Sequence, residues 1–351
     1  MKLFAAICFL FIAARHVECR RHPNREPDYK LFVFGDTFAD AGNVQKSELS
    51  RASRGWYYPY GTSDSDNDNN PSGRYSNGMV QSDYVAQILG LDASPPPYRL
   101  RKANQIDPSG ENFAMVGAGV FDSPQGLPTL DHQVVNQFDR LVNLGIIKED
   151  DLEKSVAFVA ISAGHDYKYL NDAISYDDML SLCSNVTNAI GDSVRRLQEL
   201  GVPKILVNSL APIGCAPFHT RANNYTRCIA DGVADEITKL HNTLLKHNLG
   251  DEDGVLLLDI NTFFRHLVQA GSTLSTSQNR FKHKLDPCCD NVDSDGYCGQ
   301  EDDNGNPLYT LCDDPDQYFY WDYMYPTQAG WKAVMDFLEG SIQDFLEIPS
   351  K

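Results

Sequence analysis

The chain has 351 residues, of which 42% are hydrophobic and 22% charged, and this ordinary globular composition excludes an intrinsically disordered protein. Its formal net charge of −18 argues against nucleic acid or an anionic membrane as a partner, because a strongly acidic surface repels both. The excess of acidic residues either keeps the protein soluble or serves a cationic ligand or partner.

The first 19 residues have the pattern of a secretory signal peptide. Lys2 precedes an apolar stretch, residues 3–14, which is too short to span a bilayer. Cleavage after Ala14 and cleavage after Cys19 both fit the pattern, and the sequence does not choose between them. We therefore expect a secreted, extracellular protein without a stable membrane anchor. Residues 28–349 contain no linker or internal repeat, so we expect them to form a single domain.

An apolar run, residues 31–34, predicts a strand that is buried on both faces, as in a parallel sheet. Thr37 follows just past the end of this strand, where catalytic side chains of open α/β sheets lie. Strands and helices alternate along the rest of the chain, which implies a parallel sheet with helices on both faces. We expect further strands at 156–162, 203–210 and 255–260, and helices at 80–91, 132–144, 177–200, 232–248, 261–270 and 328–346.

Two features lie in a loop and at a helix end. Residues 54–70 form a polar loop that carries Trp56, Tyr57, Tyr58 and Tyr60, and these rings either line a pocket or pack on the domain. Thr327 is expected to cap the helix that starts at residue 328.

Several segments resemble the sequence blocks of one enzyme family. FGDTFADAGN at residues 34–43 is similar to FGDSxxDxGN, the first block of the GDSL esterase/lipase family of SGNH hydrolases in its secreted plant form. ENFAMVGAGV at 111–120 resembles the second block, NxAxxG, and AGHD at 163–166 occupies the place of GxND. WDYMYPT at 321–327 resembles the last block, WDxxHPT. The resemblance implies a three-layer α/β/α sandwich with a parallel, flavodoxin-like sheet, and hydrolysis of carboxylic esters.

The resemblance also implies five catalytic positions, of which two keep the family residue. Gly117 matches an oxyanion donor and Asp322 matches the aspartate of the triad. Thr37 replaces the nucleophilic serine, His165 the asparagine that donates to the oxyanion, and Tyr325 the catalytic histidine. Gly117 could instead be a plain turn glycine, and His165 a loop residue without a role.

The three substitutions weaken the implied chemistry to different degrees. The methyl group of Thr37 crowds the path of attack, and a phenol at Tyr325 is almost fully protonated at neutral pH and offers no base. An imidazole at His165 can still donate to an oxyanion, or could act as a displaced base for Thr37.

Two functions from different classes are therefore open. The protein is either a weak hydrolase of a small acyl-ester or glycan-ester ligand, or an inactive relative that binds an acyl, glycan or protein ligand in the same pocket. An acyltransferase would use the same nucleophile and is a third alternative. We expect no cofactor and no metal, since the cysteines lack the paired CxxC spacing of a zinc site. The sequence is silent on the oligomeric state.

Seven cysteines remain after the predicted signal peptide, which fits an exported protein with disulfides. Cys215 and Cys228 bracket a 12-residue loop and are expected to pair. Cys183, on a predicted helix, is left unpaired. Four late cysteines could form two bridges, and because adjacent cysteines do not easily bond to each other, two connectivities remain. These four are Cys288, Cys289, Cys298 and Cys312.

Two glycosylation sequons are present. They are Asn185-Val186-Thr187 and Asn224-Tyr225-Thr226, and each would be modified only if it is exposed.

Overall fold

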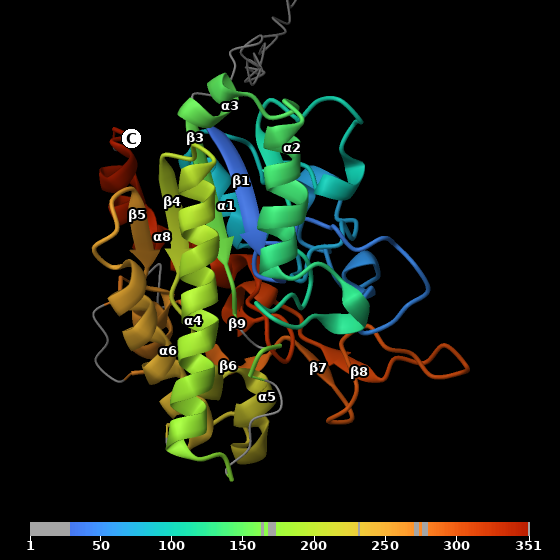
Figure 1. The fold of residues 1–351 in the computed structure, drawn as a ribbon. Helices are drawn as coiled ribbons and strands as arrows, with labels where there is room; N and C mark the ends of the chain where they lie inside the picture. Colours follow the sequence, from blue (N-terminus) through green and yellow to red (C-terminus); the bar gives the residue numbers. More distant parts are fainter. Residues whose placement is uncertain are drawn as a thin grey trace, which may run out of the picture.

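A five-stranded parallel sheet lies at the centre of the molecule, a computed structural model (Figure 1). The structure describes residues 29–162, 165–167, 173–230, 232–269, 274–275 and 280–349. The predicted signal peptide lies outside the described residues. The strands are ordered β2-β1-β3-β4-β5, and every neighbouring pair is parallel, which confirms the predicted sheet. Their bounds are Lys30–Gly35 for β1, Gly110–Asn112 for β2, Ser155–Ala160 for β3, Lys204–Asn208 for β4 and Val255–Leu258 for β5.

Helices cover both faces of this sheet. Figure 1 shows α2 and α4 in front of the strands, and α1 and α8 behind them. Among the described residues, no helix combines the length and apolar composition needed to cross a bilayer. The helices are α1 Gln81–Ile88, α2 Asp139–Asn143, α3 Glu149–Glu153, α4 Tyr176–Glu199, α5 Pro217–Thr220, α6 Val233–Leu249, α7 Ile260–Val268 and α8 Gln328–Leu346. Short 3-10 turns occur at Arg54–Trp56, Ser65–Asn67, Tyr98–Leu100, Pro124–Gly126, Ile213–Cys215, Arg221–Asn223 and Pro315–Gln317.

Alternate residues of β1 point into two separate cores. Leu31 and Val33 belong to the core formed with α1, α7 and α8, whereas Phe32 and Phe34 belong to the core formed with α4 and α6. All four side chains are fully buried, which explains why the strand has no polar alternation. The fold is therefore a three-layer α/β/α sandwich.

The helix predicted at 132–144 has an irregular first half. Its residues His132–Phe138 form a π-helical stretch, and only then does α2 begin. The fully buried amide of Gln133 in this stretch accepts a hydrogen bond from Gly35 N at 2.7 Å and donates one to Gly35 O at 2.9 Å. π-helical turns are frequent at functional sites. In this protein the π-helical stretch binds Gly35 through Gln133 and so fixes the end of β1, the strand that leads to Thr37.

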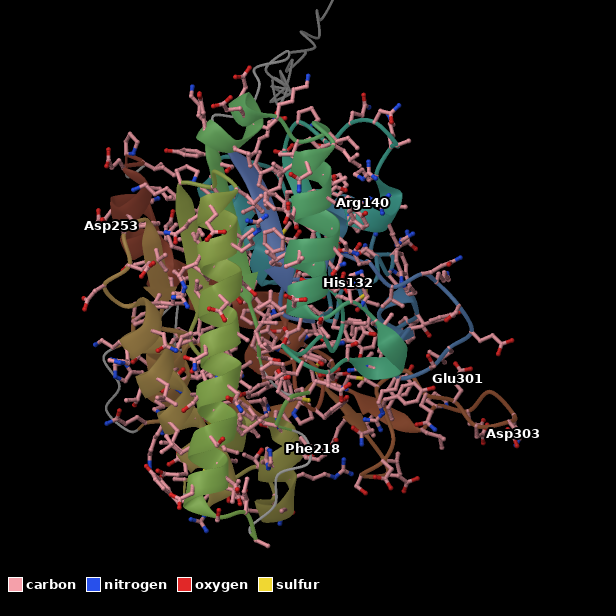
Figure 2. The ribbon with its side chains drawn as sticks, in the orientation of Figure 1. His132, Arg140, Phe218, Asp253, Glu301 and Asp303 are labelled. Atoms are coloured by element: carbon pink, nitrogen blue, oxygen red, sulfur yellow. A yellow bond between two sulfur atoms is a disulfide. The ribbon has the colours of Figure 1, made fainter. Side chains whose placement is uncertain are left out.

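Two small sheets and three disulfides organise the late part of the chain. Strand β6, His283–Pro287, pairs with β9, Tyr318–Tyr320, while β7, Cys289–Asn291, pairs antiparallel with β8, Tyr309–Leu311. The loop between β7 and β8 projects from the main body and carries the exposed carboxylates Glu301 and Asp303 (Figure 2). Of the two connectivities left open, the structure has Cys288–Cys312 and Cys289–Cys298; Cys215–Cys228 and a buried free Cys183 are confirmed.

The last helix begins where Thr327 predicts. The Thr327 side chain accepts a hydrogen bond from Gly330 N at 2.9 Å and so satisfies one of the free N–H groups of the first turn. Thr327 is fully buried, and its hydroxyl also donates to Tyr318 O at 2.9 Å. This double contact joins the start of α8 to β9 and fixes the segment that carries Asp322 and Tyr325.

A carboxyl group on the edge strand β2 is buried without full pairing. Glu111 is 2% exposed, and within the described residues its Oε2 atom has no hydrogen-bond partner. Burial raises the pKa of Glu111 from 4.5 to about 8, despite the opposing effect of Arg101. The folded protein therefore keeps this carboxyl protonated at neutral pH.

Replacing Glu111 by glutamine should stabilise the protein at pH 7 and leave it unchanged at pH 4. Between pH 4.5 and 8 the unfolded chain loses this proton while the folded chain keeps it, so the free energy of unfolding falls as the pH rises. Glutamine cannot ionise, and the variant should gain on the order of 3 kcal/mol at pH 7. Urea unfolding at the two pH values measures this, with the exposed Glu153→Gln as control. An equal gain at both pH values would contradict the assigned protonation.

Candidate active site

Four of the five predicted site residues line one cavity at the carboxyl edge of the sheet. Thr37 follows β1, Gly117 follows β2, His165 follows β3, and Tyr325 lies between β9 and α8. All four face a cavity of about 410 Å³. Asp322 is fully buried and accepts a hydrogen bond from Tyr325 N, so it lies directly behind the cavity wall. The structure therefore brings the five residues together at one place, four at the cavity and Asp322 behind it.

The hydroxyl oxygen of Thr37 accepts two hydrogen bonds. Gly117 N donates to Thr37 Oγ1 at 2.9 Å, and the Tyr325 hydroxyl donates to the same atom at 3.2 Å. A hydroxyl oxygen has two lone pairs, and both are engaged here. The Gly117 N–H, which the resemblance assigns to an oxyanion, is also used by this contact.

A side chain at position 117 would not fit. The φ angle of Gly117 is +67°, and a Cβ atom would lie 2.8 Å from Pro124 Cγ. Glycine is therefore required for backbone conformation and for space, and this lets the N–H approach Thr37. The requirement holds for binding as well as for catalysis.

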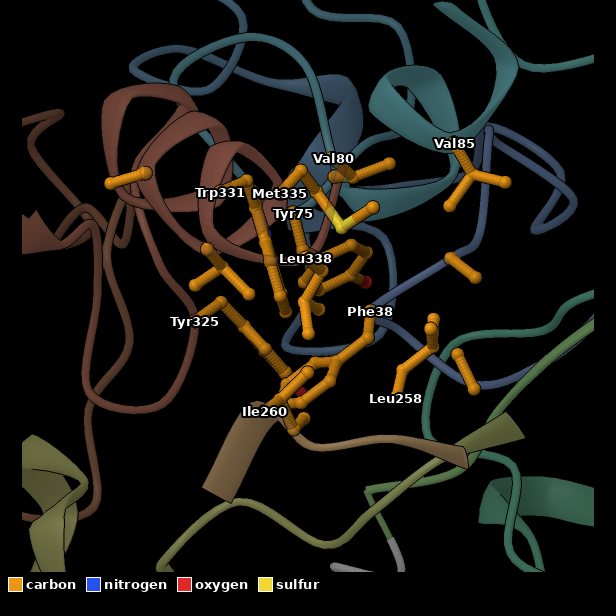
Figure 3. Packing of buried hydrophobic residues seen from close by; sticks show 14 of the residues in the cluster. Phe38, Tyr75, Val80, Val85, Leu258, Ile260, Tyr325, Trp331, Met335 and Leu338 are labelled. Atoms are coloured by element: carbon orange, nitrogen blue, oxygen red, sulfur yellow. The ribbon is translucent and has the colours of Figure 1, made fainter. Parts of the chain in front are cut away.

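Tyr325 is held as a buried, neutral phenol. Its ring packs edge-on against Tyr75 at 5.6 Å and Phe38 at 6.2 Å between centroids, in the packing shown in Figure 3. Burial raises the pKa of the phenol well above its usual value, and the neighbouring Tyr323 adds to the rise. Tyr325 can donate a hydrogen bond to Thr37 but cannot take its proton.

The carboxylate of Asp322 is already fully engaged. Its Oδ1 accepts from Met324 N at 3.0 Å and Tyr325 N at 2.9 Å, and its Oδ2 accepts from the Tyr60 hydroxyl at 2.8 Å and from Arg54 Nη2 at 3.1 Å. In the triad of the family this carboxylate would orient a histidine. Here Arg54 and Tyr60 hold it instead.

Arg54 is a buried cation inside a cage of tyrosines. It is 2% exposed, and its guanidinium lies 4.5 Å from the Tyr75 ring centre, 5.3 Å from Tyr323 and 5.7 Å from Tyr325. Its Nε also donates to the Tyr60 hydroxyl at 2.8 Å. The pair with Asp322 and the ring faces together compensate a charge that would otherwise be costly to bury.

Sequence reasoning considered the aromatic residues of the 54–70 loop but missed Arg54. A basic residue at the start of a tyrosine-rich loop was the available signal. Of the loop's rings, Tyr60 packs in the core and binds Asp322, whereas Tyr58 is 61% exposed. The cavity wall from this part of the chain is made by Ser50, Arg51, Ala52 and Arg54. The loop aromatics therefore do not line the cavity, and packing on the domain holds for Tyr60 but not for Tyr58.

His165 lies at the cavity on a turn that Asp166 anchors. Its Nε2 is 3.7 Å from Asp122 Oδ2, and the Asp166 carboxylate accepts from Val120 N at 2.8 Å and Phe121 N at 3.0 Å. These bonds join the turn after β3 to the loop after Gly117. A direct pair between His165 and Thr37 stays a prediction.

Two buried carboxylates shape the turn that carries Thr37. Asp36 Oδ2 accepts from both the N–H and the hydroxyl of Ser162 at 2.6 Å. Asp40 accepts from Gly42 N and Asn43 N at 2.7 and 2.6 Å, and from Val116 N at 2.8 Å. Burial raises the pKa of each carboxyl to about 6. These aspartates tie β1 to the loops after β2 and β3, so they build the site rather than react in it.

Within the described ranges, no group of three histidine, cysteine or acidic side chains is arranged to hold a metal ion.

The fold and the site together define a class of protein. A hydroxyl side chain, a backbone N–H donor and a buried carboxylate at the carboxyl edge of a parallel sheet are the parts of a serine-hydrolase type of site. The class defined by fold and site is therefore an α/β/α hydrolase-type protein.

Comparison with known proteins identifies the family. The model of the GDSL-like lipase/acylhydrolase family matches residues 31–338. The GDSL esterase/lipase At5g03610 of Arabidopsis thaliana is 34% identical over 89% of this chain and 86% of its own, and At3g09930 is 35% identical over 91% and 88%. A lipolytic G-D-S-L family protein from Veillonella parvula, of known crystal structure, matches 74% of this chain and 89% of its own with a TM-score of 0.36 and 12% identity. The chain belongs to the GDSL lipase/acylhydrolase family. At the level of the family, this supports hydrolysis of acyl esters.

Proposed function

We propose that this protein binds an acyl-ester or glycan-ester ligand in the cavity around Thr37 and does not hydrolyse it through the triad of its family. The observation that carries the proposal is the pair of hydrogen bonds that Thr37 Oγ1 accepts from Tyr325 and Gly117. A nucleophile must present a lone pair to the ester carbonyl and lose its proton to a base. Thr37 does neither in this arrangement.

The other members of the triad support the same proposal. Tyr325 is a protonated phenol, and Asp322, which would orient a histidine, is paired with Arg54. Loss of a triad member lowers kcat by about 10⁴-fold or more, while binding and the oxyanion site can retain about 10³ over water. Acyl transfer needs the same activated nucleophile and is disfavoured for the same reason.

Binding an ester requires only a cavity of suitable size and polar groups that contact the ligand, and the site has both. The cavity of about 410 Å³ is large enough for a small ligand, and polar groups converge on it from several loops. With its oxygen occupied as an acceptor, the Thr37 hydroxyl still has one proton, which it can donate to a ligand carbonyl. Arg51 and His165 add polar donors to the cavity wall.

Wild-type protein should hydrolyse p-nitrophenyl butyrate no faster than the Thr37→Val variant, and a fluorophosphonate probe should not label Thr37. Valine keeps the shape of threonine and removes only the hydroxyl, so the comparison isolates the nucleophile. Ester binding is measured separately, as the shift in Tm with p-nitrophenyl butyrate. Labelling at Thr37, or turnover that falls at least tenfold in the variant, would establish an active esterase and overturn the proposal.

A further inference from the structure

A second depression lies on the outer face of the long helix α4, away from the Thr37 cavity. It has a volume of about 510 Å³ and none of its lining residues lines the Thr37 cavity. Residues of α4 at three- and four-residue spacing form one side, and Phe121 forms the other. The lining residues are Phe121, Leu182, Asn185, Asn188, Ala189 and Asp192.

Asn185 lies in the middle of the α4 side and is the first residue of a glycosylation sequon. Its side chain is exposed. The sequon threonine, Thr187, is fully buried and donates to Cys183 O at 2.9 Å, so only the asparagine faces outward. A glycan on Asn185 would start inside this depression.

Phe121 is a large apolar ring that the protein itself leaves largely uncovered. It is 57% exposed, although its backbone N–H is fixed by Asp166 Oδ1 at 3.0 Å. The ring of Phe121 thus presents uncovered apolar surface within the same depression as Asn185. One face of a pyranose ring presents C–H groups, and these pack favourably on the negative face of an aromatic ring.

We infer that Asn185 carries an N-linked glycan whose first sugar packs on the ring of Phe121. The glycan covers apolar surface that the polypeptide leaves exposed, and it joins α4 to the loop that follows Gly117. Modification depends on the predicted export of the chain, and it is independent of whether the Thr37 site hydrolyses esters.

A double-mutant cycle in glycosylated protein tests this contact. The full chain is expressed in insect cells, and glycopeptide mass spectrometry should find Asn185 occupied. Asn185→Gln should then lower Tm by about 2 °C in the wild-type background and cause no measurable change in the Phe121→Ala background. Asn224→Gln is the matched control, because it removes the other sequon and should change Tm equally in both backgrounds.

Each outcome decides the inference. Occupancy at Asn185 together with loss of the effect in Phe121→Ala supports it. An unmodified Asn185, or an equal change in Tm with and without the Phe121 ring, overturns it.

Discussion

Replacing Thr37 by serine together with Tyr325 by histidine should raise the hydrolysis of p-nitrophenyl acetate by about 100-fold or more over wild type. Serine removes the methyl group that crowds the attack, and histidine supplies a base near neutral pH. Removal of Tyr325 also removes the donor at 3.2 Å that now occupies Thr37 Oγ1. Initial rates at pH 7 and pH 8 measure the gain.

The single substitutions are the controls for this prediction. Tyr325→His alone should stay within a few-fold of wild type, because the base then faces a threonine. Thr37→Ser alone should also stay low, because no base is present. A correctly folded double variant without any gain would show that the cavity itself no longer accepts the reaction of the family.

Arg54→Gln should lower the free energy of unfolding by about 3–5 kcal/mol, since it leaves a fully buried carboxylate without its cation. The guanidinium also contacts three or more tyrosine rings that glutamine cannot replace. Urea unfolding at pH 7 measures the loss. The exposed neighbour Arg51→Gln is the matched control and should change stability by less than about 1 kcal/mol.

A second substitution, at Asp322, tests whether the loss of stability comes from the charge pair. Combining Arg54→Gln with Asp322→Asn removes both charges, and most of the lost stability should return because no unpaired charge remains. If the double variant is as unstable as the two single losses added together, the ring contacts rather than the charge pair account for the effect.

The elements that sequence reasoning predicted well are those with a local cause. Strand β1 is buried on both faces, so its apolar run is uninterrupted, and helix α8 begins at residue 328 because Thr327 caps it. Strand β3 ends at Ala160, two residues before the predicted end, because Ser162 turns away to bind Asp36.

The features that could not be predicted depend on distant pairs. Arg54 and Asp322 are 268 residues apart, and no local pattern connects an arginine in a tyrosine-rich loop with an aspartate before the last helix. The late disulfides were ambiguous for the same reason. Strands β7 and β8 are antiparallel, and their register pairs Cys289 with Leu311. This register places Cys288 beside Cys312, and it cannot be predicted from the spacing of the cysteines.

In the first sequence block, residues 34–43, different side chains stabilise the fold and contact the cavity, and this has an evolutionary consequence. Asp40 and Asn43 bind backbone groups of neighbouring loops, whereas the hydrogen-bond partners of the Thr37 hydroxyl within the described part of the chain, Gly117 and Tyr325, both line the cavity. Selection for a stable fold therefore preserves most of the block even when the chemistry is abandoned. A substitution at Thr37 therefore leaves the contacts of Asp40 and Asn43 in place, and the chain keeps the sequence signature of its family.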